Sequence, residues 1–139
     1  MKNIDYIEEL HTTYGELYAL MKWAAEADSA IVYIDGRRCR TQADFLHFMA
    51  VAMNFPYDFD YTWESFDRFA FGQNATGAHK GLLVVLDHAE DMFSPRLSPL
   101  SSENETEASL KVKAHLNELS RKRTSVGMPT AVYLNFTDK

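Results

Sequence analysis

The segment from Phe55 to Asp67 combines two kinds of side chain that suit the binding of a basic protein. It contains six aromatic residues and four carboxylates, with no lysine, arginine or histidine between them. Aromatic rings supply rigid contact area, and carboxylates accept charge-assisted hydrogen bonds from arginine or lysine. The carboxylates are Asp58, Asp60, Glu64 and Asp67. The segment therefore predicts recognition of a positively charged surface, the alternative being an aromatic core with a solvated acidic face.

A second polar group follows the apolar run 82–86. Asp87, His88 and Asp91 come just beyond a predicted strand, where α/β sheets usually place their sites. A histidine with carboxylates can bind a divalent ion or act as general acid and base. The chain has no Gly-rich phosphate loop, no Gly-x-Ser-x-Gly motif and no two-histidine metal motif. We therefore predict no catalytic site, metal or cofactor, and keep a hydrolase built on these three residues as an alternative.

Charge and composition narrow the function classes. The net charge of −6 disfavours nucleic acid, because nucleic-acid affinity comes mainly from lysine and arginine. The basic run Arg121–Arg123 is explained by the dipole of the helix that it ends. No apolar run approaches the ~18 residues of a membrane span, and the N-terminus lacks the apolar core of a signal peptide. The single cysteine, Cys39, excludes an internal disulfide. We expect a cytoplasmic protein that contacts neither membrane nor nucleic acid.

Helices and strands must position these residues, and the apolar spacing predicts that the two alternate. Apolar residues recur every three or four positions over 3–27, 42–53, 63–70 and 108–123, which is typical of helices. Short apolar runs rich in β-branched residues predict strands over 30–34, 82–86 and 130–134. Strands separated by helices favour parallel pairing with right-handed crossovers. We therefore expect an α/β fold with a three-stranded parallel sheet packed by helices.

Two further expectations concern organisation. The leading helix falls in an N-terminal helical extension over 1–29, followed by one α/β domain over 30–139. Residues 94–107, rich in serine and glutamate with two prolines, are expected to form an exposed insertion.

Several motifs, taken in order, resemble those of the barstar-type ribonuclease inhibitors. They are Ile34-Asp35-Gly36, Phe55-Pro56 with Phe59, Trp63-Glu64-Ser65-Phe66, and Leu83-Val84-Val85-Leu86-Asp87 with Ala89-Glu90-Asp91. The resemblance covers about 30–93, and 108–136 more loosely. It implies a barstar-like fold, and a protein that plugs the active site of a secreted ribonuclease with the helix over 63–70 and the loop before it.

The resemblance also implies roles for individual residues. Asp58 and Phe59 take the aromatic loop positions, and Glu64 takes the family's first acidic contact. Arg68 stands where the family usually has its most buried acidic contact, so a different toxin or a repurposed surface stays open. Glu118 is the nearest candidate for the family's acidic contact from the last long helix.

The resulting prediction is an immunity-type inhibitor of a basic ribonuclease toxin, monomeric when free. Its predicted partner-binding residues are Asp58, Phe59, Asp60, Tyr61, Glu64, Asp67 and Arg68. Asp58, Glu64 and Asp67 supply charge contacts. Phe59 and Tyr61 supply packing contacts, and Trp63 and Phe66 hold the helix to the core. The alternative from another class is a non-catalytic module that self-associates through its aromatic leading helix.

Overall fold

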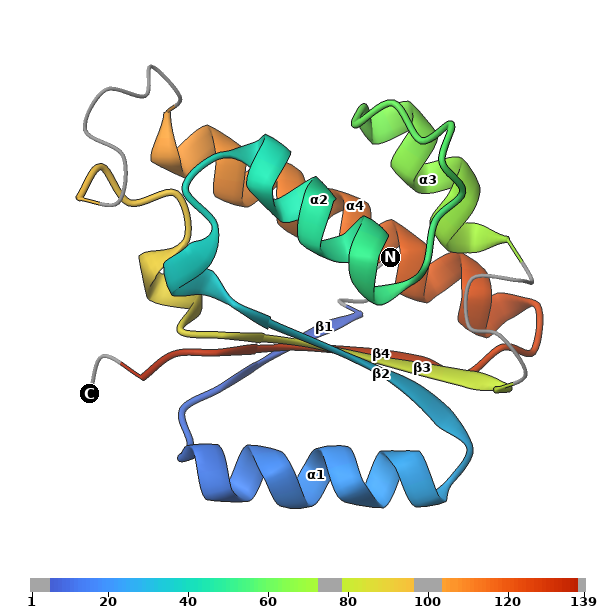
Figure 1. Ribbon diagram of the computed structural model, residues 1–139. Coiled ribbons are helices and arrows are strands. Elements are labelled where there is room, and N and C mark those ends of the chain that lie inside the picture. Colours follow the sequence, from blue (N-terminus) through green and yellow to red (C-terminus); the bar gives the residue numbers. More distant parts are fainter. Residues whose placement is uncertain (1–5, 73–78, 97–103, 138–139) are drawn as a thin grey trace, which may run out of the picture.

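A parallel sheet between two helical layers forms the protein, as the computed structural model shows (Figure 1). The structure describes residues 6–72, 79–96 and 104–137. The strands are β1 (Ile7–Leu10), β2 (Ser29–Asp35), β3 (Gly81–Asp87) and β4 (Thr130–Asn135), in the order β1-β4-β3-β2 with every neighbouring pair parallel. The parallel α/β prediction is confirmed and all three predicted strands are present, but the predicted number of three strands is wrong because β1 extends the sheet.

The helix predicted over 3–27 is wrong in its first part. β1 pairs with β4, and the helix, α1, runs only from Tyr14 to Glu26. Thr13 sets its start, since the Thr13 side chain accepts a hydrogen bond from the Glu16 N–H at 3.2 Å. A four-residue strand is too short for its alternation to stand out from helical spacing. Its pairing with a distant strand, which no local pattern reveals, decides the structure.

Helix α1 covers one face of the sheet (Figure 1). The other face carries three helices, α2 (Gln42–Ala52), α3 (Trp63–Phe71) and α4 (Glu105–Ser125). Short 3₁₀ turns, η1 (Gly36–Arg38) and η3 (Ala89–Asp91), follow β2 and β3. The predicted helices over 42–53, 63–70 and 108–123 are thereby confirmed. The last is longer than expected, so that 105–107 of the predicted insertion belong to α4, while 97–103 lie outside the described residues.

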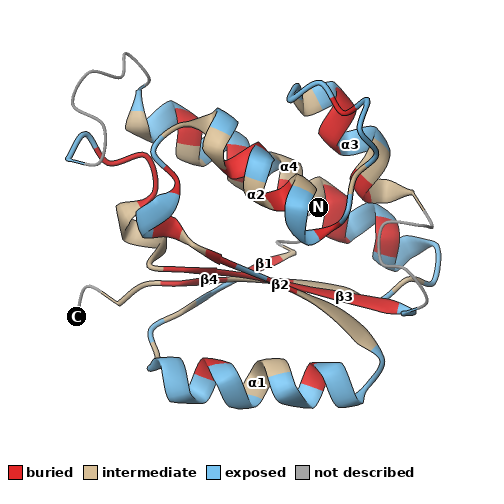
Figure 2. Ribbon diagram, viewed as in Figure 1, coloured by how far each residue is buried: buried red, intermediate tan, exposed pale blue. Residues whose placement is uncertain are grey.

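The core is divided by the sheet into two unequal parts. β3 is buried at every position, which explains its apolar sequence on both faces (Figure 2). The larger part lies between the sheet and α2, α3 and α4, and includes the fully buried Phe45 and Phe66. The smaller part lies under α1 and consists of Leu17, Ala24, Leu83 and Val85 with partly buried neighbours. Helix α3 is therefore mounted on the larger core.

Candidate protein-binding site

One face of α3 is fixed to the core, which leaves the opposite face free to carry charge. Phe66 is fully buried, and the Trp63 ring packs on Phe45 with centroids 5.8 Å apart. The Trp63 indole N–H donates to Gln42 Oε1 on α2 at 2.8 Å. Burying a large apolar side chain contributes about 1.5–3 kcal/mol, so these rings define the orientation of the helix. The predicted structural role of Trp63 and Phe66 is confirmed.

The start of α3 is fixed by a short chain of hydrogen bonds. The Thr62 hydroxyl accepts from the Ser65 N–H at 3.1 Å and donates to Asp60 Oδ1 at 2.7 Å. Asp60 also accepts from the Thr62 N–H at 3.2 Å. The hydrogen bond from the Thr62 hydroxyl is the main cause that lowers the pKa of Asp60. Asp60 is exposed, but it serves the helix start as well as any partner.

The outer face of α3 borders a groove whose other wall is α4. Glu64, Asp67 and Arg68 are exposed and lie within four residues of one another, so they share one side of the helix. Together with Phe71, Glu118, Leu119 and Lys122 they line a groove of about 410 Å³. The groove therefore has two apolar residues between charged ones. It also brings Glu118, the sequence candidate on the last helix, next to the predicted site.

Asp67 and Arg68 are each held by a neighbour. Asp67 Oδ1 lies 2.8 Å from Nδ1 of His115 on α4, and the His115 ring stacks on Trp63 at 4.3 Å between centroids. The Arg68 guanidinium lies over the Phe69 ring, 4.8 Å from its centroid. The contact of Asp67 with His115 connects α3 to α4, and the two contacts restrict the directions in which the Asp67 and Arg68 charges can point.

Glu118 and Glu64 differ in how far their charges are already neutralised. Glu118 pairs with Arg121 and Lys122 on its own helix, and the hydrogen bond from Arg121 lowers its pKa. Glu64 has no ion pair and no side-chain hydrogen bond within the described part of the chain. Its charge is therefore the most available of the groove for a partner.

The loop before α3 sorts its aromatic residues between core and surface. Phe59, predicted as a packing contact for the partner, is only 7% exposed and packs on Phe55 at 5.0 Å between centroids. Tyr61 is 48% exposed and has a φ of 61°, a left-handed conformation that is uncommon for tyrosine. Asp58 is exposed. Tyr57, which the sequence reasoning missed, is fully exposed.

Residue type was the one signal that could have sorted these rings. The loop alternates Tyr57, Phe59 and Tyr61, and the ring without a hydroxyl is the one that enters the core. Phe59 therefore stabilises the loop from below, and the two tyrosines form its surface.

Asp87 belongs to the buried interior of the sheet. It is 2% exposed, and its carboxylate accepts from the Tyr33 hydroxyl at 2.6 Å and from Asn135 Nδ2 at 3.0 Å. Burial, followed by the hydrogen bond to Asp87, raises the pKa of Tyr33. Asp87 connects three strands and does not face a substrate, so the hydrolase alternative loses its first residue.

The remaining polar residues after β3 also have partners. His88, Glu90 and Asp91 place ligand atoms within 4.8 Å of one another, close enough to hold a metal ion. The Thr137 hydroxyl, however, donates to Glu90 at 2.8 Å and lies 2.8 Å from His88 Nδ1, while Arg96 pairs with Asp91. This group ties the chain after β4 to η3, and its contacts favour a structural role over a catalytic one.

The basic run near the end of α4 is not a continuous exposed surface. Arg121 pairs with Glu118, and Arg123 is fully buried, where its Nε donates to Thr130 Oγ1 at 2.9 Å. Only part of the run is exposed to solvent, and within it Lys122 lines the acidic groove.

Fold and site together define a small parallel α/β protein whose candidate site is a charged groove between two helices. The profile of the Barstar family, described as barstar (barnase inhibitor), matches residues 29–125. The chain belongs to the barstar family. No curated protein matches the chain. The match begins with β2, so β1 and α1 lie outside it. Among the described residues, no helix is both long and apolar enough to cross a membrane.

Proposed function

We propose that the chain is an immunity-type inhibitor that binds the basic active site of a cognate ribonuclease toxin and catalyses no reaction itself. One observation carries the proposal: Glu64 and Asp67 of α3 and Glu118 of α4 line a single groove beside a helix that is fixed to the core. A ribonuclease binds phosphates, so its active site is positively charged. Carboxylates on a rigid helix complement such a site in charge and cover it physically.

The surroundings of the groove support a protein partner over a small molecule. Tyr57 and Tyr61 expose their rings on the loop that leads into α3, and exposed tyrosines are typical anchors of protein interfaces. Arg68 adds a positive charge between the acids, which requires an acceptor on the partner at that position. We infer that the partner site is basic around Glu64 and Asp67 and carries an acidic or neutral oxygen opposite Arg68.

Net charge adds to the rate of association. A chain of net charge −6 attracts a basic partner over about one Debye length, roughly 8–10 Å at physiological ionic strength. Association should therefore slow as salt is added, while dissociation depends mainly on the contacts at the groove.

The experiment first identifies the toxin and then tests the site. Reading frames that neighbour the gene are expressed in cells with and without the chain, and a toxic product whose toxicity the chain removes is the partner. Calorimetry then compares the wild type with the double variant Glu64→Ala/Asp67→Ala. The matched control is Glu9→Ala/Glu16→Ala, which removes two exposed carboxylates from β1 and α1, outside the family match.

Loss of two charged contacts of about 1.5 kcal/mol each should weaken binding about a hundredfold in the Glu64 and Asp67 variant. The control should bind within about threefold of the wild type, because neither of its carboxylates lines the groove and both act on the partner only through long-range charge. Circular dichroism should show that both variants stay folded. Equal affinities of the two double variants, both folded, would refute the proposed site.

A further inference from the structure

His115 of α4 contacts one of the carboxylates that line the groove between α3 and α4. Its Nδ1 lies 2.8 Å from Oδ1 of Asp67. Its ring lies nearly parallel to the Trp63 indole, with the centroids 4.3 Å apart and an angle of 13° between the planes. The side chain of His115 is 23% exposed and that of Asp67 is 48% exposed. The imidazole is therefore held from two sides, and both it and the carboxylate still reach solvent.

The ring that supports His115 is itself fixed. Trp63 packs on Phe45, and its indole N–H donates to Gln42 Oε1 of α2. A rotation that took Nδ1 of His115 away from Asp67 would also disturb the stack on Trp63. The imidazole therefore stays beside the carboxylate whether or not it carries a charge.

Histidine is the side chain that changes charge between about pH 5 and 8. With two protons, the His115 ring forms an ion pair with Asp67 and a cation–π contact with Trp63. Its positive charge then offsets the charge that Asp67 offers to the groove. With one proton, the neutral ring donates a hydrogen bond through Nδ1 and leaves the charge of the carboxylate uncompensated. The charge that the groove offers to a cation thus depends on a single proton.

The other charged residues around His115 are not of a type that ordinarily changes charge between about pH 5 and 8. They belong to α3, α4 and α2, and are Glu64, Arg68, Lys111, Glu118 and Asp44. Asp44 is paired with Arg40. Helix α2 also carries a histidine, His47, whose Nδ1 lies 3.4 Å from the Tyr61 hydroxyl. His115 is therefore the histidine whose proton acts directly on a carboxylate of the groove.

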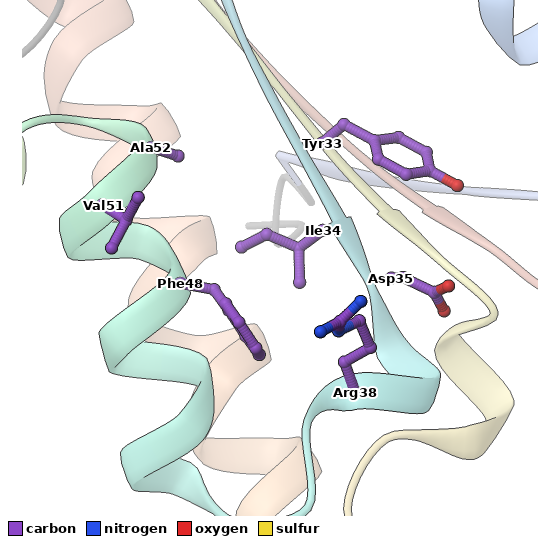
Figure 3. Close-up of a pocket in the computed structure, with 7 residues that line it drawn as sticks. All are labelled: Tyr33, Ile34, Asp35, Arg38, Phe48, Val51 and Ala52. Carbon is purple, nitrogen blue, oxygen red and sulfur yellow. The ribbon is translucent and has the colours of Figure 1, made fainter.

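The other large groove of the described residues has no such pair. It measures about 450 Å³, lies between β2 and α2, and is lined by apolar side chains with Asp35 and Arg38 (Figure 3). Asp35 is paired with Arg37 at 2.7 Å, and arginine keeps its charge at every ordinary pH. No histidine is among the lining residues. Of the two grooves, the one between α3 and α4 is thus the one whose carboxylate is paired with a histidine.

We propose that His115 is a proton switch that sets how much of the Asp67 charge the groove offers to a basic partner. The identity of that partner, a basic toxin, rests on the proposed function, whereas the switch is a property of the free chain. At low pH the imidazolium holds the carboxylate and adds a positive charge beside the groove. A basic partner then binds only against that charge, so the affinity rises with pH and binding releases a proton from His115. His115 is a positioning residue, because it acts through Asp67.

The first test uses the free chain. In a Trp23→Phe background Trp63 is the remaining tryptophan, and its fluorescence reports on the charge of the ring stacked on it. A titration between about pH 5 and 8 should show a one-proton transition that His115→Gln removes. The matched control is His11→Gln, since His11 is exposed and stacks on Phe136, away from the groove. The control should keep the transition.

The same titration measures the coupling between the two side chains. Asp67→Asn removes the charge that attracts the imidazolium and keeps an acceptor for its N–H. The midpoint of the Trp63 transition should therefore move to lower pH by about half a unit, the size expected for a partly exposed pair.

The second test measures a cation whose own charge does not depend on pH. A labelled hexa-arginine peptide, acetylated and amidated at its ends, has no group that titrates between about pH 5 and 8. Its affinity is measured by fluorescence anisotropy at low ionic strength. From about pH 5.5 to 8 the affinity of the wild type should rise about threefold more than that of His115→Gln, and His11→Gln should follow the wild type.

Three results overturn the switch. They are a Trp63 transition that His115→Gln leaves intact, a midpoint that Asp67→Asn does not move, and the same pH dependence of peptide binding in the wild type and in His115→Gln. Failure of the proposed inhibitor site looks different. The peptide then binds the wild type no more tightly than Glu64→Ala/Asp67→Ala, while the Trp63 titration still decides the switch.

Discussion

Leu17→Ala tests whether α1 is part of one cooperative fold or a separately unfolding extension. Leu17 is fully buried and belongs to the small core between α1 and the sheet, where it packs with Leu83 and Val85 of β3. Since β3 is also the centre of the larger core, damage on the α1 side should be felt by the whole molecule. The test therefore decides whether the segment outside the family match folds with the rest.

The expected magnitude follows from the burial. Truncating a fully buried leucine to alanine costs about 2–5 kcal/mol, with larger values where the cavity cannot collapse. The core under α1 has four buried residues surrounded by partly buried ones, so it can relax in part. We expect a loss of about 3 kcal/mol. Against a total stability of about 5–15 kcal/mol this is a large fraction.

Urea unfolding measures the effect on both sides of the sheet. In a Trp23→Phe background the remaining tryptophan, Trp63, reports on the interface of α3 and α4, whereas far-UV circular dichroism reports on all helices. Leu17→Ala should shift both transitions together by the same free energy. The matched control, Tyr18→Ala, removes an exposed side chain from the same helix and should change the stability by less than about 0.5 kcal/mol.

A Trp63 transition that stays in place while circular dichroism gains an earlier phase would refute this reasoning. It would mean that α1 unfolds before the rest of the chain, as expected if residues 1–29 are a separate N-terminal extension.

Two further predictions concern buried polar groups. Arg123→Met should leave the free energy of unfolding unchanged or raise it by about 1 kcal/mol. The reason is that Arg123 Nη2 has no hydrogen-bond partner among the described residues and that burial lowers the pKa of this guanidinium. A urea titration that shows a clear loss of stability would contradict this prediction. Burial also raises the pKa of the Cys39 thiol to about 12, so iodoacetamide should alkylate the native chain at least about a hundredfold more slowly than the unfolded one near neutral pH, and equal rates would show an accessible thiol.

The sequence predicted those elements whose patterns are local. The three predicted strands are short apolar runs rich in β-branched residues, which favour a strand, and the helices have apolar residues spaced along one face. β1 was missed because Ile7 and Leu10 satisfy the helical spacing of α1 as well as a strand, and only the pairing with β4 decides between the two. Non-local pairing of this kind has no local signature.

The candidate site was predictable in the same uneven way. The exposure of Glu64 and Asp67 follows from the position of Phe66 on the opposite face of one helix, which sequence spacing reveals. The groove required the packing of α3 on α4, which brings Glu118 beside them, and spacing within one helix says nothing of that. The sequence predicted Phe59 on the surface of the loop, where the structure has Tyr57 instead. This loop has no helical or strand periodicity from which the buried side could be predicted.

The segment before the family match changes what the rest of the chain can do. β1 covers the β4 edge of the sheet, and the Tyr6 N–H donates to Asn117 Oδ1 of α4 at 2.6 Å, which fastens the segment to the larger core. α1 covers the face that Leu83 and Val85 would otherwise expose. One face is thereby covered and β4 becomes an inner strand, while the groove of α3 and α4 is left untouched. The described sheet therefore has its two edges at β1 and β2.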